Sequence, residues 1–126
     1  MWSLAIAACA ALTGNPAVVD PKRVVEHTLG ANGEGRAAVV FPETGARHTR
    51  RHAVIYLWED GRWCRVGTGD YIRGSTLVDR GGRNRGIRMI DRSERAVDMY
   101  WLGGRLVLMQ RGKQIAALDT PATGCK

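Results

Sequence analysis

The chain has 126 residues, of which 44% are hydrophobic and 25% are charged. This length and composition favour one globular domain with an ordinary core and exclude disorder over most of the chain. Sixteen arginines and three lysines against twelve acids give a formal net charge of +7. Such an excess suits bidentate contacts to an acidic partner and is equally typical of a GC-rich genome.

The first segment carries no charged side chain before Asp20, and residues 4–12 are all apolar or small. A run of this length is too short to cross a bilayer as a helix but is typical of a secretory leader. We therefore expect residues 1–19 to be a leader or an N-terminal apolar segment, and residues 20–126 to form the domain. The alternative is a short buried core helix over residues 2–12, which would place the protein in the cytoplasm.

The stretch IAACAALTG within this segment resembles the lipobox of bacterial lipoproteins. In that family a run of small residues precedes a cysteine that is lipidated and becomes the first residue of the mature chain. The resemblance implies a lipid anchor on Cys9. Contact with a membrane would then depend on this anchor or on the leader alone.

Cys64 and Cys125 remain as an even pair when Cys9 is set aside as a lipid anchor. An oxidising compartment allows such a pair to form a disulfide, which we predict; the alternative is two unrelated thiols. No CxxC or Cys/His spacing typical of a zinc site occurs, so we expect neither a metal nor a cofactor.

A helix is predicted over residues 21–29. Asp20 can cap it, Pro21 can take the first helical position, and Gly30 can end it. Four apolar or small side chains of this segment fall on one stripe that could cover a sheet: Val24, Val25, Thr28 and Leu29.

From Arg36 onward the hydrophobic period becomes that of strands. A two-residue turn at Asp60-Gly61 pairs Glu59 with Arg62 and continues, residue by residue, to Ile55 with Val66. One face of this hairpin is then apolar: Ile55, Leu57, Cys64 and Val66. The other face carries Tyr56, Trp58, Trp63 and Arg65.

Two further turns, at Gly103-Gly104 and Arg111-Gly112, give a three-stranded meander with a single apolar face. That face holds Val97, Met99, Trp101, Leu106, Leu108, Ile115 and Ala117. With the segments RAAVVF, STLVD and GIRMID, the chain has about eight short strands. The predicted fold is mainly β: one N-terminal helix plus a small antiparallel β-barrel or strongly bent sheet.

The predicted binding surface combines basic loops with the aromatic face of the hairpin. Arginine loops beside exposed aromatic rings can bind single-stranded nucleic acid through phosphate contacts and base stacking. The alternatives are solvated turns and a tryptophan face packed under the N-terminal helix. The candidate binding residues are Arg47, Arg50, Arg51, Tyr56, Trp58, Trp63, Arg65, Arg83, Arg85, Arg88 and Arg111.

The stretch HAVIYLWEDGRWCRVGTGDY resembles the histidine strand of papain-like and transglutaminase-like hydrolases. The resemblance implies His52 as the base, Asp70 as its orienting partner and Cys9 as the nucleophile. No polar residue surrounds Cys9 to lower the pKa of its thiol or to form an oxyanion hole. His52 as a surface residue at the start of a strand is the other interpretation.

The tail YWLGGRLVLMQRGKQIAAL, followed by GC, resembles the closing strands of bacterial lipoprotein inhibitors of c-type lysozyme. That family implies a small β-barrel, a bridge between Cys64 and Cys125, and a basic loop at Arg111-Gly112 that enters the cleft of its partner.

These observations favour a small domain of the cell envelope, periplasmic or secreted, that acts as a binding or inhibitor-like domain rather than as an enzyme. The expected partner is an acidic protein or another anionic component of the envelope. A single-stranded nucleic-acid-binding protein and a cysteine hydrolase remain the alternatives.

Overall fold

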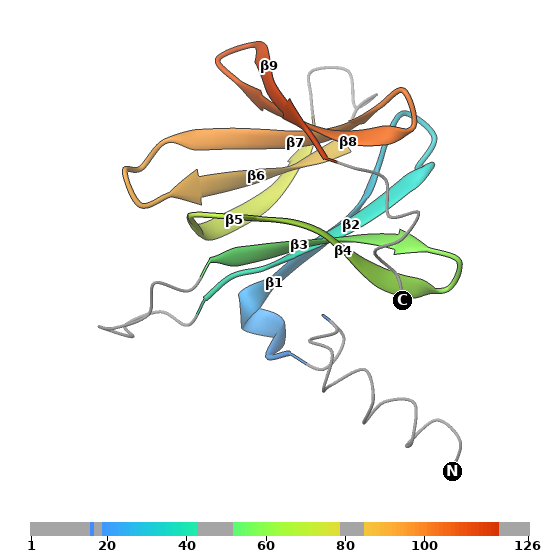
Figure 1. Ribbon diagram of the computed structural model, residues 1–126, viewed down its shortest axis with the longest axis horizontal. Helices are drawn as coiled ribbons and strands as arrows, with labels where there is room; N and C mark the ends of the chain where they lie inside the picture. The colour runs from blue at the N-terminus through green and yellow to red at the C-terminus, as the bar shows by residue number, and fades with distance from the viewer. Residues whose placement is uncertain (1–15, 17–18, 43–51, 79–84, 119–126) are drawn as a thin grey trace.

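The computed structural model describes residues 16, 19–42, 52–78 and 85–118. These residues hold nine strands in two antiparallel sheets (Figure 1). The mainly β prediction is confirmed, with nine strands where about eight were expected. The elements are η2 (Pro21–Arg23), β1 (Val24–Leu29), β2 (Gly35–Val40), β3 (Ala53–Glu59), β4 (Arg62–Gly69), β5 (Tyr71–Val78), β6 (Arg85–Asp91), β7 (Ala96–Leu102), β8 (Arg105–Gln110) and β9 (Lys113–Ala117).

The segment predicted as an N-terminal helix, residues 21–29, is one 3-10 turn followed by a strand, so that prediction is wrong. The Asp20 carboxylate does accept a hydrogen bond from the Lys22 N–H at 3.0 Å, but the turn ends at Arg23. β1 follows and pairs with β2 along its whole length. Three of its six residues are β-branched, which favours a strand over a helix. Gly30, at φ +86°, opens the connection to β2.

Each strand pairs with the next one along the chain, in the orders β1-β2-β3-β4 and β5-β6-β7-β8-β9. Asp70 alone separates β4 from β5, so the chain passes sharply from the first sheet to the second. β1 contacts β5 and β6, and the side chain of Leu118, directly after β9, lies against Gly67 of β4. The two sheets face each other across a shared core, and the described strands form no closed barrel.

The hairpin of β3 and β4 has the predicted register from Glu59–Arg62 to Tyr56–Arg65. The last predicted pair is wrong, because a β-bulge follows Tyr56 and Ile55 pairs with Gly67 instead of Val66. In β3 the predicted alternation of core-facing residues is kept past the bulge, because Ile55 is fully buried.

The C-terminal meander follows the Gly103-Gly104 turn as predicted, with Met99 opposite Leu108. The Arg111-Gly112 turn also forms, but a bulge in β9 pairs Leu108 with Ala116. The placement of Ile115 and Ala117 on the core face is therefore wrong. Ile115 is 52% exposed.

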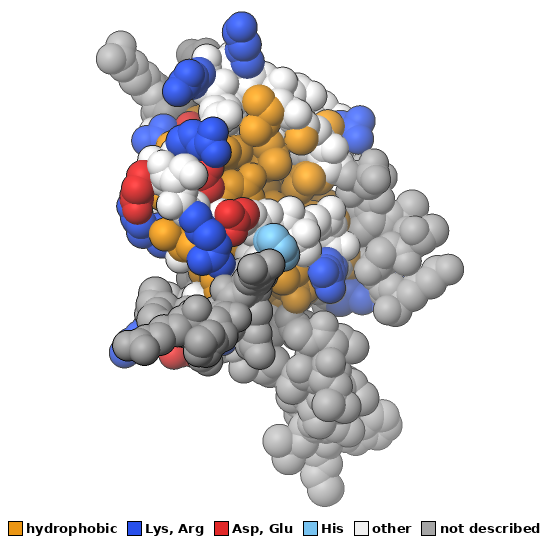
Figure 2. All heavy atoms as spheres, turned by 60° about the vertical axis from the view of Figure 1, so that its left-hand side comes forward, with side chains coloured by type: hydrophobic (Ala, Val, Ile, Leu, Met, Phe, Trp, Pro, Cys, Tyr) orange, Lys and Arg blue, Asp and Glu red, His pale blue; other side chains and the backbone are white. Residues whose placement is uncertain are grey.

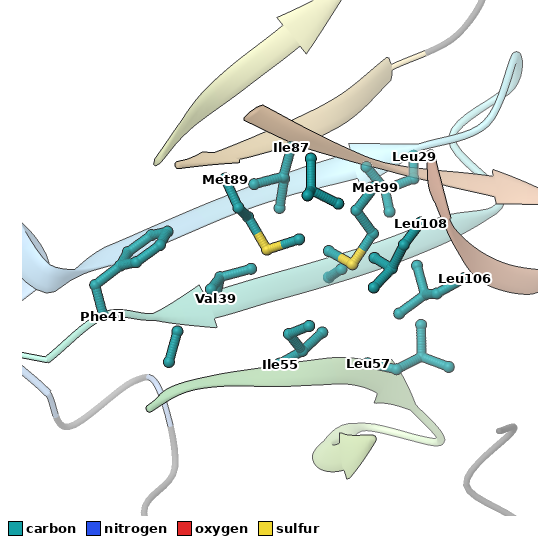
Figure 3. Close-up of a cluster of buried hydrophobic side chains, with 13 residues drawn as sticks. Leu29, Val39, Phe41, Ile55, Leu57, Ile87, Met89, Met99, Leu106 and Leu108 are labelled. Atoms are coloured by element: carbon teal, nitrogen blue, oxygen red, sulfur yellow. The ribbon is translucent and has the colours of Figure 1, made fainter. Parts of the chain in front are cut away.

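The core lies between the sheets and draws on both (Figure 3). Met89 and Met99 extend from the second sheet towards Val39 and Ile55 of the first, and all four are fully buried. Burial of such side chains supplies most of the free energy that holds the sheets together. The cluster consists of Leu29, Ala37, Val39, Phe41, Ala53, Ile55, Leu57, Ile87, Met89, Val97, Met99, Leu106 and Leu108.

Most of the predicted leader lies outside the described residues, including Cys9 and the alternative core helix over residues 2–12. Both interpretations of this segment therefore stay predictions. Within the described ranges, no helix has the length and apolar character needed to cross a membrane.

Candidate anion-binding surfaces

The candidate binding residues fall into three groups. Four lie outside the described residues: Arg47, Arg50, Arg51 and Arg83. Four lie on β3 and β4 of the first sheet: Tyr56, Trp58, Trp63 and Arg65. Three belong to the second sheet or its turns: Arg85, Arg88 and Arg111.

The aromatic face of the first sheet is closed by an arginine from the neighbouring strand. Trp58 and Trp63 meet edge to face, with ring centroids 5.0 Å apart. The guanidinium of Arg36 lies 4.8 Å from one ring centroid and 5.3 Å from the other, and it also pairs with Glu26. The Arg36 guanidinium thus contacts both tryptophan rings, and these cation–π contacts stabilise the sheet.

Two further candidate residues adjoin this face: Tyr56, which lies on β3 with Trp58, and Arg85, which comes from β6 of the second sheet. Tyr56 is 7% exposed, and its burial raises the pKa of the phenol, while Arg65 acts in the opposite direction. Arg85 donates a hydrogen bond to the Thr28 hydroxyl at 3.1 Å, which joins β6 to β1. The predicted aromatic side chains thus share one face with Arg65, while Arg85 reaches it from the other sheet. No helix of the described chain covers the two tryptophans.

Several arginines of the second sheet are neutralised by carboxylates. Arg88 holds Asp98 through two hydrogen bonds, of 2.7 and 2.9 Å, and this pairing raises the pKa of the guanidinium. Such surface pairs contribute little to stability, but they remove the charge from use by a ligand. The same holds for the pairs Arg73–Glu94, Arg92–Asp70 and Arg95–Asp91.

A basic hollow of about 320 Å³ lies at the end of the second sheet where the β6–β7 and β8–β9 turns meet. We call it the basic hollow. It is lined by three basic side chains and no acidic one, and of the three only Arg95 is paired, with Asp91. The lining residues are Arg95, Gln110, Arg111, Lys113 and Ile115. In Figure 2, where the left-hand side of Figure 1 comes forward, Lys and Arg side chains lie above and to the left of an exposed apolar area, with Asp and Glu side chains among those on the left.

The chain forms this hollow through two turns. Arg111 at φ +51° and Gly112 at φ +78° form the tight β8–β9 turn, which projects the first cation. The second turn is organised by Asp91, whose carboxylate accepts the backbone N–H groups of Ser93 and Arg95 at 2.8 and 2.9 Å. These bonds, chiefly the one from Arg95, lower the pKa of the Asp91 carboxyl.

A second hollow of about 470 Å³ adjoins the basic hollow and shares Arg95, Gln110 and Arg111 with it. Its lining includes the Arg88–Asp98 pair and Glu94, so it is mixed in charge. Of these two adjoining hollows, the basic hollow carries the unbalanced positive charge, because Arg111 and Lys113 form no ion pair with any described residue.

Asp91→Ala is expected to lower the melting temperature at pH 7, because it removes the acceptor that orders the β6–β7 turn. The Asp91 pKa is lower in the folded chain, so the carboxylate stabilises the fold above the unfolded pKa of about 4. This contribution is lost as the pH falls through the lowered folded value. Melting curves should therefore converge for the two proteins in acid. Glu59→Ala, a change in an exposed carboxylate, should leave the melting temperature unchanged.

The residues of the hydrolase alternative do not assemble within the described chain. Asp70 pairs with Arg92 at 2.5 Å, and no hydrogen bond joins it to His52. His52 lines a different hollow, of about 380 Å³, together with Arg23 and Arg65. Cys9 lies outside the described residues. Among those that are described, no group of three His, Cys, Asp or Glu side chains is placed to hold a metal.

Sequence reasoning found Arg111 but not the other cations of the basic hollow. Arg95 comes from a different hairpin, and Lys113 follows the turn on the edge strand. The register at Arg111-Gly112 was a usable signal for Lys113, since it fixes that residue as the first of β9. Nothing local in the sequence signals the approach of Arg95.

No family model, no curated protein and no solved structure matches this chain.

Proposed function

We propose that this protein is a small, non-enzymatic binding domain of the cell envelope that holds an acidic partner protein at the basic hollow. One observation supports this above all: Arg111 and Lys113 line a concave site that has no acidic side chain, while Arg73 and Arg88 on the same sheet pair with carboxylates. Exposed cations of this kind add little to folding but accelerate and orient association with an acidic surface.

An acidic protein suits the basic hollow better than nucleic acid does. Single-strand binding draws much of its affinity from bases stacked on aromatic rings. The lining of the basic hollow offers charge, one amide and one aliphatic side chain, but no aromatic ring. Carboxylates need only the guanidinium and ammonium groups that it provides.

Reversing both charges, Arg111→Glu with Lys113→Glu, is expected to weaken binding of a short poly-glutamate probe at least about tenfold, which corresponds to about 1.4 kcal/mol. Binding should also fall as salt rises, because these charges lie at the surface. Isothermal titration at two salt concentrations measures both effects.

The matched control is Lys22→Glu with Arg62→Glu, which changes the net charge equally at positions outside the lining of the basic hollow. Equal losses in the two double variants would mean that overall charge, and not the basic hollow, binds the probe. An oligonucleotide bound more tightly than poly-glutamate, and lost in Arg111→Glu with Lys113→Glu, would assign the surface to nucleic acid instead.

The envelope location belongs to the same proposal and rests on the sequence. The apolar start, the lipobox-like cysteine and the even pair Cys64 and Cys125 all favour export, to the periplasm or outside the cell. The intact mass of the protein from its native host tests this. It would reveal a cleaved leader, a diacyl group on Cys9, or neither.

A further inference from the structure

β9 is the last strand of the second sheet, at the edge of that sheet. Within the described chain it pairs only with β8, so half of its backbone N–H and C=O groups point away from any strand in that part of the molecule. Four of its five residues are exposed. An edge of this kind is a template for another extended segment.

The bulge in β9 leaves an apolar side chain of this edge strand exposed. Leu108 pairs with Ala116 and Met109 with Gln114, which leaves Ile115 as the extra residue. Bulges often redirect a side chain next to a functional site. Ile115 is 52% exposed and lines the basic hollow, so it offers an apolar contact directly beside the cations.

The charge along the edge selects what can bind there. Lys113 is the first residue of β9, and Arg111 lies in the turn just before it. A second copy of this edge would bring like charges together, which opposes self-association. A strand with carboxylates would meet opposite charges at the same positions.

We infer that the edge strand β9 binds an extended acidic peptide segment by strand addition, with its carboxylates at Arg111 and Lys113 and an apolar side chain against Ile115. This inference rests on the proposed function, because it states how the acidic partner is held. Main-chain hydrogen bonds to β9 supply affinity, and the two cations and Ile115 select the sequence.

The test uses a ten-residue peptide that repeats glutamate-glutamate-valine, so that both faces of the extended strand carry valine between glutamates. A second peptide of the same sequence has a methyl group on every backbone nitrogen. It keeps the charge but cannot donate ladder hydrogen bonds. The first peptide is expected to bind at least about tenfold more tightly and to slow hydrogen exchange of the backbone amides in Lys113–Ala117.

Ile115→Gln is expected to weaken binding of the unmethylated peptide about fivefold, because about half of an isoleucine side chain loses its apolar contact. Leu102→Gln is the matched control, since Leu102 is also an exposed aliphatic residue of this sheet, at 43%. It should leave the affinity unchanged.

Two results would overturn the inference alone. If both peptides bind equally, or if exchange in β9 does not change on binding, the basic hollow binds charge without strand addition. The proposed function would then stand, provided that Arg111→Glu with Lys113→Glu still weakens binding of poly-glutamate at least about tenfold. If the unchanged protein binds neither of the two peptides nor poly-glutamate, the inference and the proposed function are both overturned.

Discussion

Gly74→Ala is expected to lower the free energy of unfolding by about 3 kcal/mol, the upper part of the usual range for overpacking. A Cβ atom at this position would lie 2.6 Å from the carbonyl oxygen of Arg88 and 2.6 Å from the Phe41 ring. Neither neighbour can move freely. Arg88 belongs to β6, which pairs with β5, and Phe41 is a core residue that is 5% exposed.

Gly67→Ala is the matched control, because Gly67 is also a strand glycine at the interface of the two sheets. Its nearest neighbours are methyl carbons of Leu118, at 3.3 and 3.7 Å, and the end of a leucine side chain can shift. Urea denaturation of the two variants should show a clearly larger loss for Gly74→Ala. Equal losses would mean that the sheets do not approach each other as closely at Gly74 as the structure has them.

The hairpin registers could be predicted because each two-residue turn fixes the pairing next to it. Asp60 and Gly61, at φ +50° and +79°, form such a turn, and the pairing beside it is the predicted one. The bulges could not be predicted. An extra residue can enter a strand at several points without changing the turn, and its cost depends on packing that alternation does not encode.

The helix prediction failed for a different reason. Asp20 and Pro21 correctly mark the start of a turn, but a cap determines where a turn begins and not how far it continues. The next residues pair with β2, and that tertiary contact decides the conformation. Local propensity is a weak guide wherever a segment can join a sheet.

The candidate site was predicted only in part. The sequence shows which residues are arginines, but it does not show which of them pair with a carboxylate in the folded chain. Arg88 belonged to an apparently basic segment, yet it holds Asp98 across a strand pair, ten residues away. Arg92 holds Asp70, 22 residues away. Only the fold shows that Arg88 of β6 has an acidic partner, while Arg111 and Lys113 have none among the described residues.

Loss of a bridge between Cys64 and Cys125 is expected to lower the free energy of unfolding by about 4 kcal/mol, since the bridge would close a loop of about half the chain. Cys64 is 1% exposed on β4. Leu118 lies against Gly67, three residues further along the same strand. Seven more residues span at most about 25 Å, which is ample to return to Cys64, so the pairing is within reach of the chain.

The chain has one further cysteine, Cys9, so three proteins can show which cysteine pairs with Cys64: the unchanged protein and the variants Cys125→Ser and Cys9→Ser. Cys125→Ser should lower the melting temperature as much as a reducing agent does, and a reducing agent should then have no further effect on that variant. Cys9→Ser should leave the melting temperature unchanged. The opposite pattern would show that Cys64 pairs with Cys9, which would tie the apolar start to the domain and exclude cleavage of a leader beyond that residue. No effect of reduction on any of the three proteins would mean that the thiols are separate, and the argument for an oxidising compartment would lose its strongest support.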